Sequence, residues 1–487
     1  MKNTKFFSQV ISAVLAASVT VSLLCTNAYA AEKFEPAKEA TKNMKAGINI
    51  GNTLDAHGSW LTGDWVLYDY DTYSDAHEQC WGNPMITKEY IAALKDAGFS
   101  TVRLPVTWFP HTDSKGNITK DRLDRVQEVV DWILAEDMYC IINMHHDATN
   151  GKEFLKATKQ NYEKNSARVK TTWKQIAERF KDYDEKLIFE GYNEMGDSDE
   201  ITAEAIKYYN KYVQLFVDTV RKTGGNNKQR NLMFQPFRSN LSKEVWDNLY
   251  VPKDSAENHL ILSFHTYEPW TFTHTHEVAH WLNKNDMTDK WGSDADKKWA
   301  DDYISSAAKF TKKTGIPAAL TEHGANLKDN VPEVAEYAGY FAKTCAKYDM
   351  PYFWWEASAS EKPEGKDSMG LMDRHKNKPY KAQTKIVEAI VLNANLGKLP
   401  APTVKGKLSK GNVTLSWDKV GCAYGYKVYQ YDNASKKYKQ VDFIKGTQKT
   451  IKGLSKGSHK FKVVAVSKYN NKNTNGKSSN VVKVTVK

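Results

Sequence analysis

The chain has 487 residues, of which 41% are apolar and 12% aromatic, and it carries a formal net charge of +11. This composition excludes an intrinsically disordered chain, and the length favours more than one domain. Five cysteines are too few for a disulfide scaffold in a chain of this size. The net charge makes a nucleic-acid or membrane partner the first hypothesis to check along the chain.

The first thirty residues have the pattern of a secretory signal peptide. Lys2 and Lys5 form a basic start, an uncharged apolar stretch covers residues 10–24, and residues 28–30 supply a small-x-small cleavage site. The apolar stretch is short for a membrane span. We therefore predict a signal peptide over residues 1–30 and a secreted mature protein, extracellular or associated with a cell wall, with no membrane partner after cleavage.

Short apolar runs alternate with amphipathic helical patterns over residues 31–395. The helical patterns include residues 87–97, 122–136 and 201–223, of which the first and last end at glycine. The runs expected to form strands are residues 46–51, 101–108, 139–145, 187–193, 231–237, 259–267, 317–321 and 351–356. Near-continuous apolar strands are typical of a parallel sheet covered on both faces, and eight strand–helix repeats close a (β/α)8, or TIM, barrel. We predict this α/β fold over a doubly wound sheet, because no Gly-rich phosphate loop follows a strand.

Polar residues stand at the predicted strand ends, which meet on the rim where barrel enzymes place their active sites. Glu194 and Glu322 come from separate strands and can face each other across a cleft. Glycoside hydrolysis uses such a pair: one acid protonates the leaving oxygen and one carboxylate attacks the anomeric carbon. Arg103 could keep the nucleophile ionised, and Glu190, inside a strand, is interpreted as a salt-bridged core residue.

These residues resemble the strand ends of glycoside hydrolase family 5, the cellulase family, and in particular its bacterial endo-β-1,4-glucanases. The resemblance extends over about residues 46–392. The motifs that carry it are residues 51–56 (GNTLDA), 81–84 (WGNP), 102–108 (VRLPVTW), 143–147 (NMHHD), 189–190 (FE), 223–227 (TGGNN) and 263–267 (SFHTY).

The resemblance implies that Glu194 is the acid/base and Glu322 the nucleophile of a double displacement with retention, with the carboxyls about 5 Å apart. It implies no cofactor and no metal, and a β-glucan substrate: cellulose or a related glucan, with xyloglucan, mannan or xylan as alternatives. Tyr267 would donate to the nucleophile and Trp355 would stack on a sugar ring. The substrate-binding residues that we expect are Arg103, Trp108, His111, His145, His146, Asn193, His265, Tyr267 and Trp355.

Two other features leave alternatives open. The string His276-Glu277-Val278-Ala279-His280 matches HExxH, which on a helix places two histidines beside a general-base glutamate to bind zinc. No third histidine follows at the metzincin spacing, so a zinc metalloprotease is the less favoured hypothesis. The loop between residues 55 and 81 holds aromatic residues that either extend a sugar cleft or pack onto the barrel; they are Trp60, Trp65, Tyr68, Tyr70 and Tyr73.

The composition changes sharply near residue 400. Residues 401–487 contain 19 Lys, no Arg and three acids, for a net charge of +16, whereas residues 31–400 carry −7. Residues 396–402 form a short linker, and alternating apolar residues around Trp417 predict an all-β sandwich over 403–487 that loosely resembles a fibronectin type III domain. Its lysines could bind an anionic cell-wall polymer or act as a solubilising surface. The lack of Arg argues against a nucleic-acid partner, and we expect a monomer.

Overall fold

A computed structural model describes residues 34–58, 72–148, 155–196, 201–357, 368–469 and 472–487. The predicted signal peptide and the loop aromatics Trp60, Trp65, Tyr68 and Tyr70 lie outside these ranges. Within them, no helix is long and apolar enough to cross a membrane. Cys80, Cys140, Cys345 and Cys422 are free thiols.

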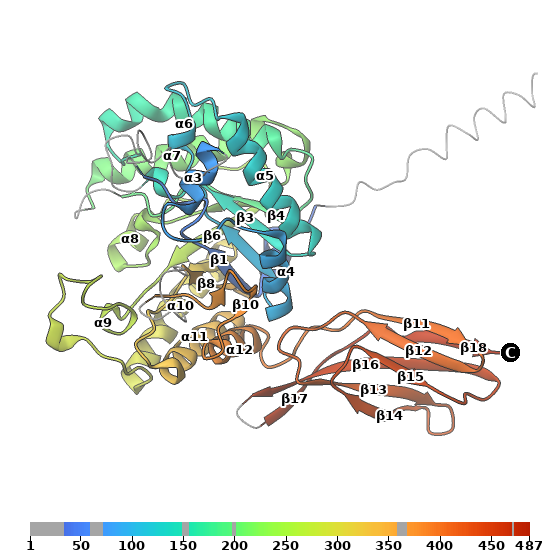
Figure 1. Ribbon diagram of the computed structural model, residues 1–487. Helices are drawn as coiled ribbons and strands as arrows, with labels where there is room; N and C mark the ends of the chain where they lie inside the picture. Colours follow the sequence, from blue (N-terminus) through green and yellow to red (C-terminus); the bar gives the residue numbers. More distant parts are fainter. Residues whose placement is uncertain (1–33, 59–71, 149–154, 197–200, 358–367, 470–471) are drawn as a thin grey trace, which may run out of the picture. The chain divides into compact units, whose positions relative to one another are not determined.

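Eight parallel strands close into a barrel in the order β1 to β8, with β8 pairing with β1, which confirms the predicted (β/α)8 fold (Figure 1). The strands are β1 Ala46–Ile50, β2 Thr101–Leu104, β3 Tyr139–Asn143, β4 Leu187–Glu190, β5 Leu232–Phe234, β6 Leu260–His265, β7 Ala318–Glu322 and β8 Tyr352–Glu356. Several are shorter than their apolar runs. The last residues of those runs leave the ladder and form the loops that line the rim.

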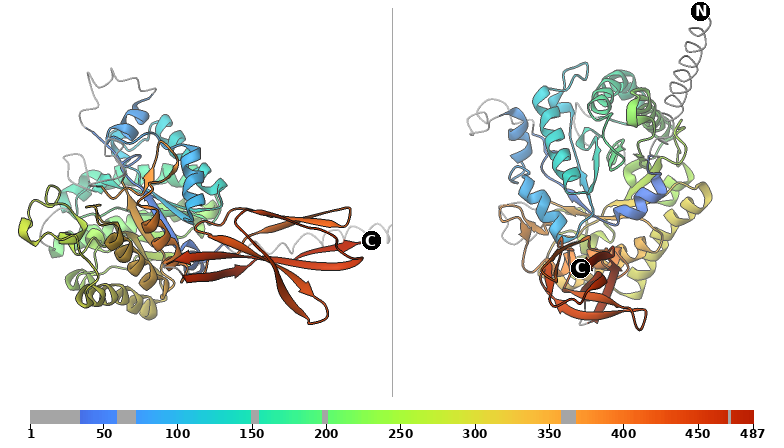
Figure 2. Two further views of the ribbon diagram at one scale, coloured as in Figure 1. Left: turned by 60° about the horizontal axis from the view of Figure 1, so that its bottom comes forward. Right: turned by 90° about the vertical axis from the view of Figure 1, so that its right-hand side faces the viewer.

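Helices surround the barrel (Figures 1 and 2). They are α2 Ala37–Met44, α3 Tyr73–Gln79, α4 Lys88–Ala97, α5 Lys120–Ala135, α6 Lys159–Arg179, α7 Ala203–Lys222, α8 Lys243–Asp247, α9 Trp270–Thr273, α10 Asp294–Thr314, α11 Val331–Ala346 and α12 Thr384–Ala394. Short 3-10 turns are η2 Phe109–His111, η3 His146–Ala148, η4 Gly225–Lys228, η5 Phe237–Ser239 and η6 Lys284–Asp286. A two-residue ladder joins β9 Met372–Asp373 to β10 Lys378–Pro379. Thr87 caps α4 through its side chain, and Gly98 ends it with φ 106°, as the sequence pattern predicts.

The inside of the barrel is apolar at one level and polar at the next. The apolar level includes Ile141, Ile188, Met233, Ile261, Ala319 and Phe353, all buried in one cluster. Side chains alternate across a strand, so the residue two positions further along points inward again. On six strands that residue is Asn143, Glu190, Gln235, Ser263, Thr321 or Trp355. The rim of the barrel therefore rests on a largely polar layer.

The C-terminal segment is all-β, as predicted, and consists of two antiparallel sheets. One sheet contains β11 Val404–Ser409, β12 Asn412–Trp417 and β15 Gln448–Ile451. The other contains β13 Gly425–Asp432, β14 Lys437–Ile444, β16 Gly457–Tyr469, β17 Lys472–Ser478 and β18 Val482–Val486. Leu415 and Trp417 of the first sheet share a buried cluster with Val428 and Val463 of the second, so the two sheets pack face to face.

Candidate active site

A pocket opens at the carboxyl ends of the barrel strands, where the sequence places the site. Its lining brings together most of the predicted residues, with loop residues that no strand-end pattern indicated. The lining residues are Asn52, His145, His146, Asn193, Glu194, Tyr267, His274, Val278, Glu322, Asn326, Trp355, Ala357, Ser368 and Met369.

Arg103 of β2 lies fully buried beneath this pocket and is held on every side. Its Nη1 donates to Glu322 Oε1 at 2.5 Å and to Asn49 Oδ1 at 2.9 Å, and its Nη2 donates to Asn193 Oδ1 at 2.8 Å. Nε donates to Glu190 Oε2 at 2.7 Å. Burial lowers the pKa of Arg103, but the charges of Glu190 and Glu322 outweigh this effect and raise it. The guanidinium is therefore a permanent charge in a fixed orientation.

Glu190 is the buried counter-ion of Arg103, in agreement with its interpretation as a salt-bridged core residue. Its Oε2 also accepts from Asn143 Nδ2 at 2.9 Å, while Oε1 accepts from Gln235 Nε2 at 2.9 Å and from Ser263 Oγ at 2.5 Å. Sequence reasoning missed these three donors. Their only signal was a polar residue at an inward position of an otherwise apolar strand.

Glu194 follows β4 in a left-handed backbone conformation, with φ 46°. Its backbone N–H donates to Gln235 Oε1 at 3.1 Å and to Ser239 Oγ at 3.2 Å, which holds the turn in place. A non-glycine residue in this region costs of order 1–3 kcal/mol. The turn directs the carboxylate toward His265, whose Nδ1 lies 2.7 Å from Glu194 Oε1.

Glu322 ends β7 and is almost fully buried, with 5% of its side chain exposed against 38% for Glu194. Tyr267 OH donates to Glu322 Oε2 at 2.9 Å, and His265 Nδ1 lies 3.6 Å from the same oxygen. Burial and the neighbouring carboxylates raise the pKa of Tyr267 well above its ordinary value, so its hydroxyl keeps its proton. One carboxylate oxygen of Glu194 and one of Glu322 lie within 4.8 Å of each other, with His265 between them.

The two carboxyls influence each other's protonation. Burial raises the pKa of Glu322, the charges of His265 and Arg103 oppose it, the charge of Glu194 adds to it, and the net direction is upward. Burial also acts on Glu194, but the hydrogen bond and charge of His265 and the charge of Arg103 outweigh it and lower its pKa. These directions place the pKa of Glu322 above that of Glu194.

His145 and Trp355 form one wall of the pocket, with ring centroids 5.5 Å apart and planes 7° from parallel. Burial, followed by the charges of His146 and Arg103, lowers the pKa of His145 well below its ordinary value, so the imidazole is neutral. A neutral imidazole can offer a hydrogen bond to a sugar hydroxyl without bringing a charge. The stacked ring of Trp355 offers an apolar face to a sugar ring.

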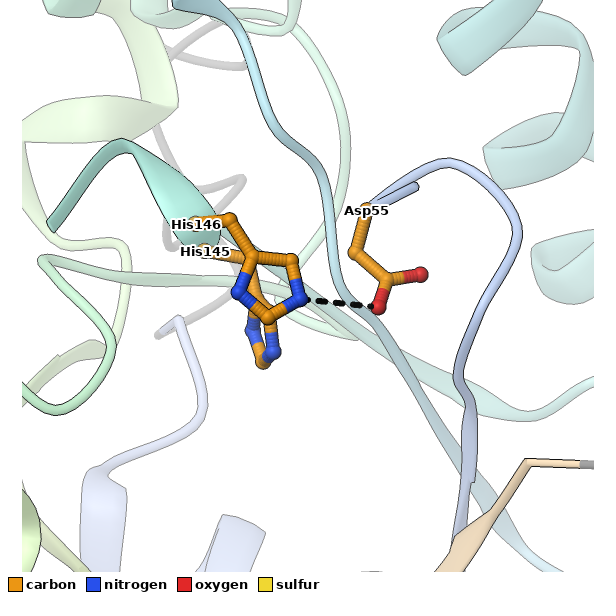
Figure 3. Close-up of side chains that lie close together, drawn as sticks. All are labelled: Asp55, His145 and His146. Carbon is orange, nitrogen blue, oxygen red and sulfur yellow. Dashed lines mark ion pairs between the residues drawn. The ribbon is translucent and has the colours of Figure 1, made fainter. Parts of the chain in front are cut away.

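His146 lies beside His145 and faces Asp55 from the loop after β1 (Figure 3). The His146 Nε2 atom is 3.4 Å from Asp55 Oδ2. The carboxylate of Asp55 also accepts from the backbone N–H groups of Asn52 and Thr53, at 3.1 and 2.8 Å. Asp55, His145 and His146 have potential metal-ligand atoms within 4.8 Å of one another, and so do Glu194, His265 and Glu322. In the first group an ion-pair contact joins His146 to Asp55, and in the second a hydrogen bond joins His265 to Glu194, so contacts within the site account for both groups.

Trp108 and His111 do not line the pocket, contrary to the prediction that they bind substrate. Trp108 is fully buried, and its Nε1 donates to the Asn143 carbonyl at 2.8 Å. The His111 ring packs against His77, with centroids 4.6 Å apart, and is also buried. The η2 turn directs both side chains behind the ends of β2 and β3, where they support the rim.

The HExxH string does not form the helix that a zinc protease requires. Residues 276–280 lie in turns between α9 and η6, with Glu277 and His280 exposed and His276 half-buried. These side chains are in neither of the two groups of potential metal ligands found among the described residues. The structure therefore counts against the metalloprotease hypothesis.

Comparison with known proteins agrees with this geometry. The family described as "Cellulase (glycosyl hydrolase family 5)" matches residues 61–361. "Endoglucanase A" of Clostridium longisporum is 34% identical over 350 residues, which cover 71% of this chain and 63% of the relative. "Xyloglucan-specific endo-beta-1,4-glucanase BoGH5A" of Bacteroides ovatus is 30% identical over 375 residues, 72% of this chain and 69% of the relative.

A solved structure extends the comparison to the fold. The "GH5-4 broad specificity endoglucanase" of Clostridium longisporum superimposes with a TM-score of 0.65 at 31% identity, over 74% of this chain and 99% of that one. The family match and the barrel agree with the residues that meet at the rim. The chain therefore belongs to glycosyl hydrolase family 5, the cellulase family.

Proposed function

We propose that this protein is a retaining endo-β-1,4-glucanase that hydrolyses internal bonds of cellulose or related β-glucans. The observation that carries the proposal is the approach of Glu194 and Glu322 to within 4.8 Å, measured between carboxylate oxygens. Inverting glycosidases hold their carboxyls about 6.5–9.5 Å apart to leave room for a water, whereas retaining enzymes hold them about 5–5.5 Å apart. The short separation favours a covalent intermediate and retention.

In this mechanism Glu322 is the nucleophile. Arg103 and Tyr267 each donate to one of its two oxygens, which orients the carboxylate and stabilises its anionic form. Attack on the anomeric carbon forms a glycosyl ester with Glu322 while the bond to the leaving oxygen breaks. Glu194 gives its proton to that oxygen.

In the second step Glu194 acts as a base. It removes a proton from a water that attacks the anomeric carbon, and the ester bond to Glu322 breaks to release the sugar with its original configuration. The partial exposure of Glu194 and its position on the pocket wall suit a group that must meet both the leaving oxygen and the incoming water.

These roles need the proton on Glu194 when substrate is bound, whereas the surrounding protein groups give Glu322 the higher pKa. We propose that a close carboxyl pair titrates as a unit and that substrate moves the shared proton. A glycosidic oxygen beside Glu194 accepts a hydrogen bond from its protonated form. Arg103 and Tyr267 remain on Glu322 and favour its anion.

The range of substrates follows from the surfaces on either side of the pair. Trp355 and His145 form one wall, and a second depression on the Glu194 side includes Trp270 and Trp299. Aromatic walls bind sugar rings through the faces of the rings, so this binding depends little on the side groups of the polysaccharide chain. Because one relative carries the name of a xyloglucan-specific glucanase, xyloglucan is the second candidate, followed by mannan and xylan.

The roles can be tested with Glu194→Gln and Glu322→Gln. Each variant is expected to lose about a thousandfold or more in kcat on soluble β-glucan while keeping the thermal midpoint of the wild type, because each removes a reacting group. Glu257→Gln, an exposed glutamate just before β6, is the matched control and should keep full activity. Full activity in either active-site variant would refute the role assigned to it.

The stereochemistry provides a separate test. Proton NMR during early hydrolysis should show the β-anomer as the first product, and azide should rescue Glu194→Ala by forming a β-glycosyl azide, because the covalent intermediate still forms. An α-anomer as the first product would establish inversion. Cleavage should be unaffected by a chelator and should release short oligosaccharides early from internal cuts.

Finer expectations belong to the same proposal. A signal peptide over residues 1–30 would export the enzyme, residues 31–395 would form the catalytic domain, and residues 396–402 the linker. Residues 403–487 would form a fibronectin type III-like module in a monomeric protein. The composition break near residue 400 and the two packed sheets support this division. Amino-terminal sequencing of the exported protein should find Ala31 first.

A further inference from the structure

The outer face of the sheet that contains β13, β14, β16 and β18 carries tyrosines and lysines side by side. We call it the Tyr–Lys face, and it consists of Tyr429, Tyr431, Tyr438, Lys460, Lys462 and Lys483. Strand register places them together: Tyr429 is opposite Lys462, Tyr431 opposite Tyr438, and Lys460 opposite Lys483. The intervening residues Val428, Phe461 and Val463 point into the core and are buried.

The tyrosines and lysines are in contact with one another. Lys462 Nζ lies 4.6 Å from the ring centroid of Tyr438 and 5.5 Å from that of Tyr429, and Lys460 Nζ lies 5.1 Å from that of Tyr431. The rings of Tyr431 and Tyr438 are 5.1 Å apart. The three tyrosines are half-exposed, so this is an ordered aromatic surface with cations resting on it.

The positive charge of this face is not balanced within the segment. Of the three acids in residues 401–487, Asp432 pairs with Lys439 and Asp442 with Lys449. Among the residues that the structure describes, no carboxylate lies within ion-pair distance of Lys460 or Lys462. Lys460 and Lys483 lie opposite each other on neighbouring strands, which are only about 4.8 Å apart, so these two lysines repel each other, and a bound polyanion would relieve that repulsion.

The other sheet provides an internal comparison. Its outer face carries Lys405 and Lys407 opposite Ser416 and Thr414, with no aromatic side chain on these strand positions. Lysines therefore occur on the outer faces of both sheets and do not by themselves distinguish the two. The combination of lysines with tyrosine rings packed edge to face distinguishes the Tyr–Lys face.

We propose that the Tyr–Lys face binds a carboxylate-bearing polysaccharide, that is, a polymer of uronic acid residues. Sugar rings would lie against the tyrosines, and Lys460 and Lys462 would move from the aromatic rings to the carboxylates. A neutral polysaccharide would leave the lysines without a counter-charge. A phosphate chain without rings would leave the tyrosines unused. This binding activity goes beyond the proposed glucanase and does not depend on it.

The test uses the full-length protein and three polymers in binding titrations: polygalacturonate, fully methyl-esterified polygalacturonate and inorganic polyphosphate. Polygalacturonate should bind at least about tenfold more tightly than either of the others, because only it offers both rings and charges. Equal binding of the esterified polymer would refute the role of the lysines. Equal binding of polyphosphate would refute the role of the tyrosines and indicate simple charge attraction.

Variants locate the site. Lys460→Gln/Lys462→Gln should weaken polygalacturonate binding about tenfold, whereas Lys405→Gln/Lys407→Gln, which removes the same charge from the other sheet, should weaken it no more than about twofold. Tyr438→Ser should weaken binding of polygalacturonate but not of polyphosphate. Thermal midpoints and activity on soluble β-glucan should match the wild type in all three variants. An equal loss in both lysine pairs would overturn the assignment to this face.

Discussion

Tyr267 and Arg103 stabilise the same carboxylate. Only the hydroxyl of Tyr267 can be removed by one substitution without leaving a buried charge unpaired. Tyr267→Phe removes the hydrogen bond to Glu322 Oε2 and keeps the ring. The anion of Glu322 is then less stabilised, so its pKa, already raised by burial, rises further. Because the nucleophile must be ionised, the variant should lose activity at a higher pH than the wild type does when the pH is lowered.

We therefore predict that the acid limb of kcat/KM moves upward by about half a pH unit or more in Tyr267→Phe, with kcat reduced about 10- to 100-fold. The measurement is the pH profile on soluble β-glucan. Tyr340→Phe, which removes a tyrosine hydrogen bond to Asp301 away from the site, is the control and should leave the profile in place. An unchanged acid limb in Tyr267→Phe would mean that the tyrosine does not act on Glu322.

The residues that sequence reasoning found and missed differ in one physical respect. Glu194 and Glu322 stood out because a carboxylate is unusual at the end of an apolar strand and therefore indicates a functional residue. Gln235 and Ser263 did not, since their part in holding Glu190 depends on which way a strand residue points and on its neighbours across the barrel. Trp108 was misread because the direction of the η2 turn decides whether an aromatic residue faces the cleft or supports it.

At the scale of elements, the apolar runs predicted every barrel strand but placed several ends too late. The run over residues 101–108 ends as a strand at Leu104, and the run over 187–193 ends at Glu190. Strand pairing ends where the chain turns to direct side chains into the pocket. The hydrophobicity of the sequence does not indicate where that turn begins. Helix ends were clearer, because threonine caps and left-handed glycines satisfy backbone groups locally.

Helix α10 offers a test of that local rule. Gly315 ends the helix with φ 78°, and no atom lies within 4 Å of the position that a Cβ would occupy. Gly315→Ala should therefore destabilise the protein by about 1 kcal/mol through backbone strain alone. Calorimetry should show a thermal midpoint lower by about 2 °C or less, since the shift per kcal/mol shrinks with size.

Gly446→Ala is the matched control. Its Cβ would also meet nothing within 4 Å, but its φ is not in the left-handed range. The midpoint should stay the same or rise slightly, because alanine restricts the unfolded chain. Equal effects at the two glycines would show that the left-handed conformation of Gly315 carries no cost.

At the scale of the whole molecule, the net charge of +11 is the sum of unlike parts. Residues 31–400 carry −7, residues 401–487 carry +16, and Lys2 and Lys5 add +2. The charge that first indicated a nucleic-acid partner therefore belongs to the segment without the catalytic residues. A glucan enzyme that also holds a carboxylated polysaccharide would stay close to a substrate embedded in it, because attachment raises the local concentration of enzyme.

This coupling predicts how the full-length enzyme responds to salt. Raising the ionic strength from about 0.1 M to about 1 M shortens the screening length from about 10 Å to about 3 Å. Hydrolysis of β-glucan trapped in a polygalacturonate gel should slow about threefold or more, while hydrolysis of soluble β-glucan should change little. Lys460→Gln/Lys462→Gln should show the slower rate in the gel at both salt concentrations. If the wild type and this variant respond to salt alike in the gel, the Tyr–Lys face does not place the enzyme on its substrate.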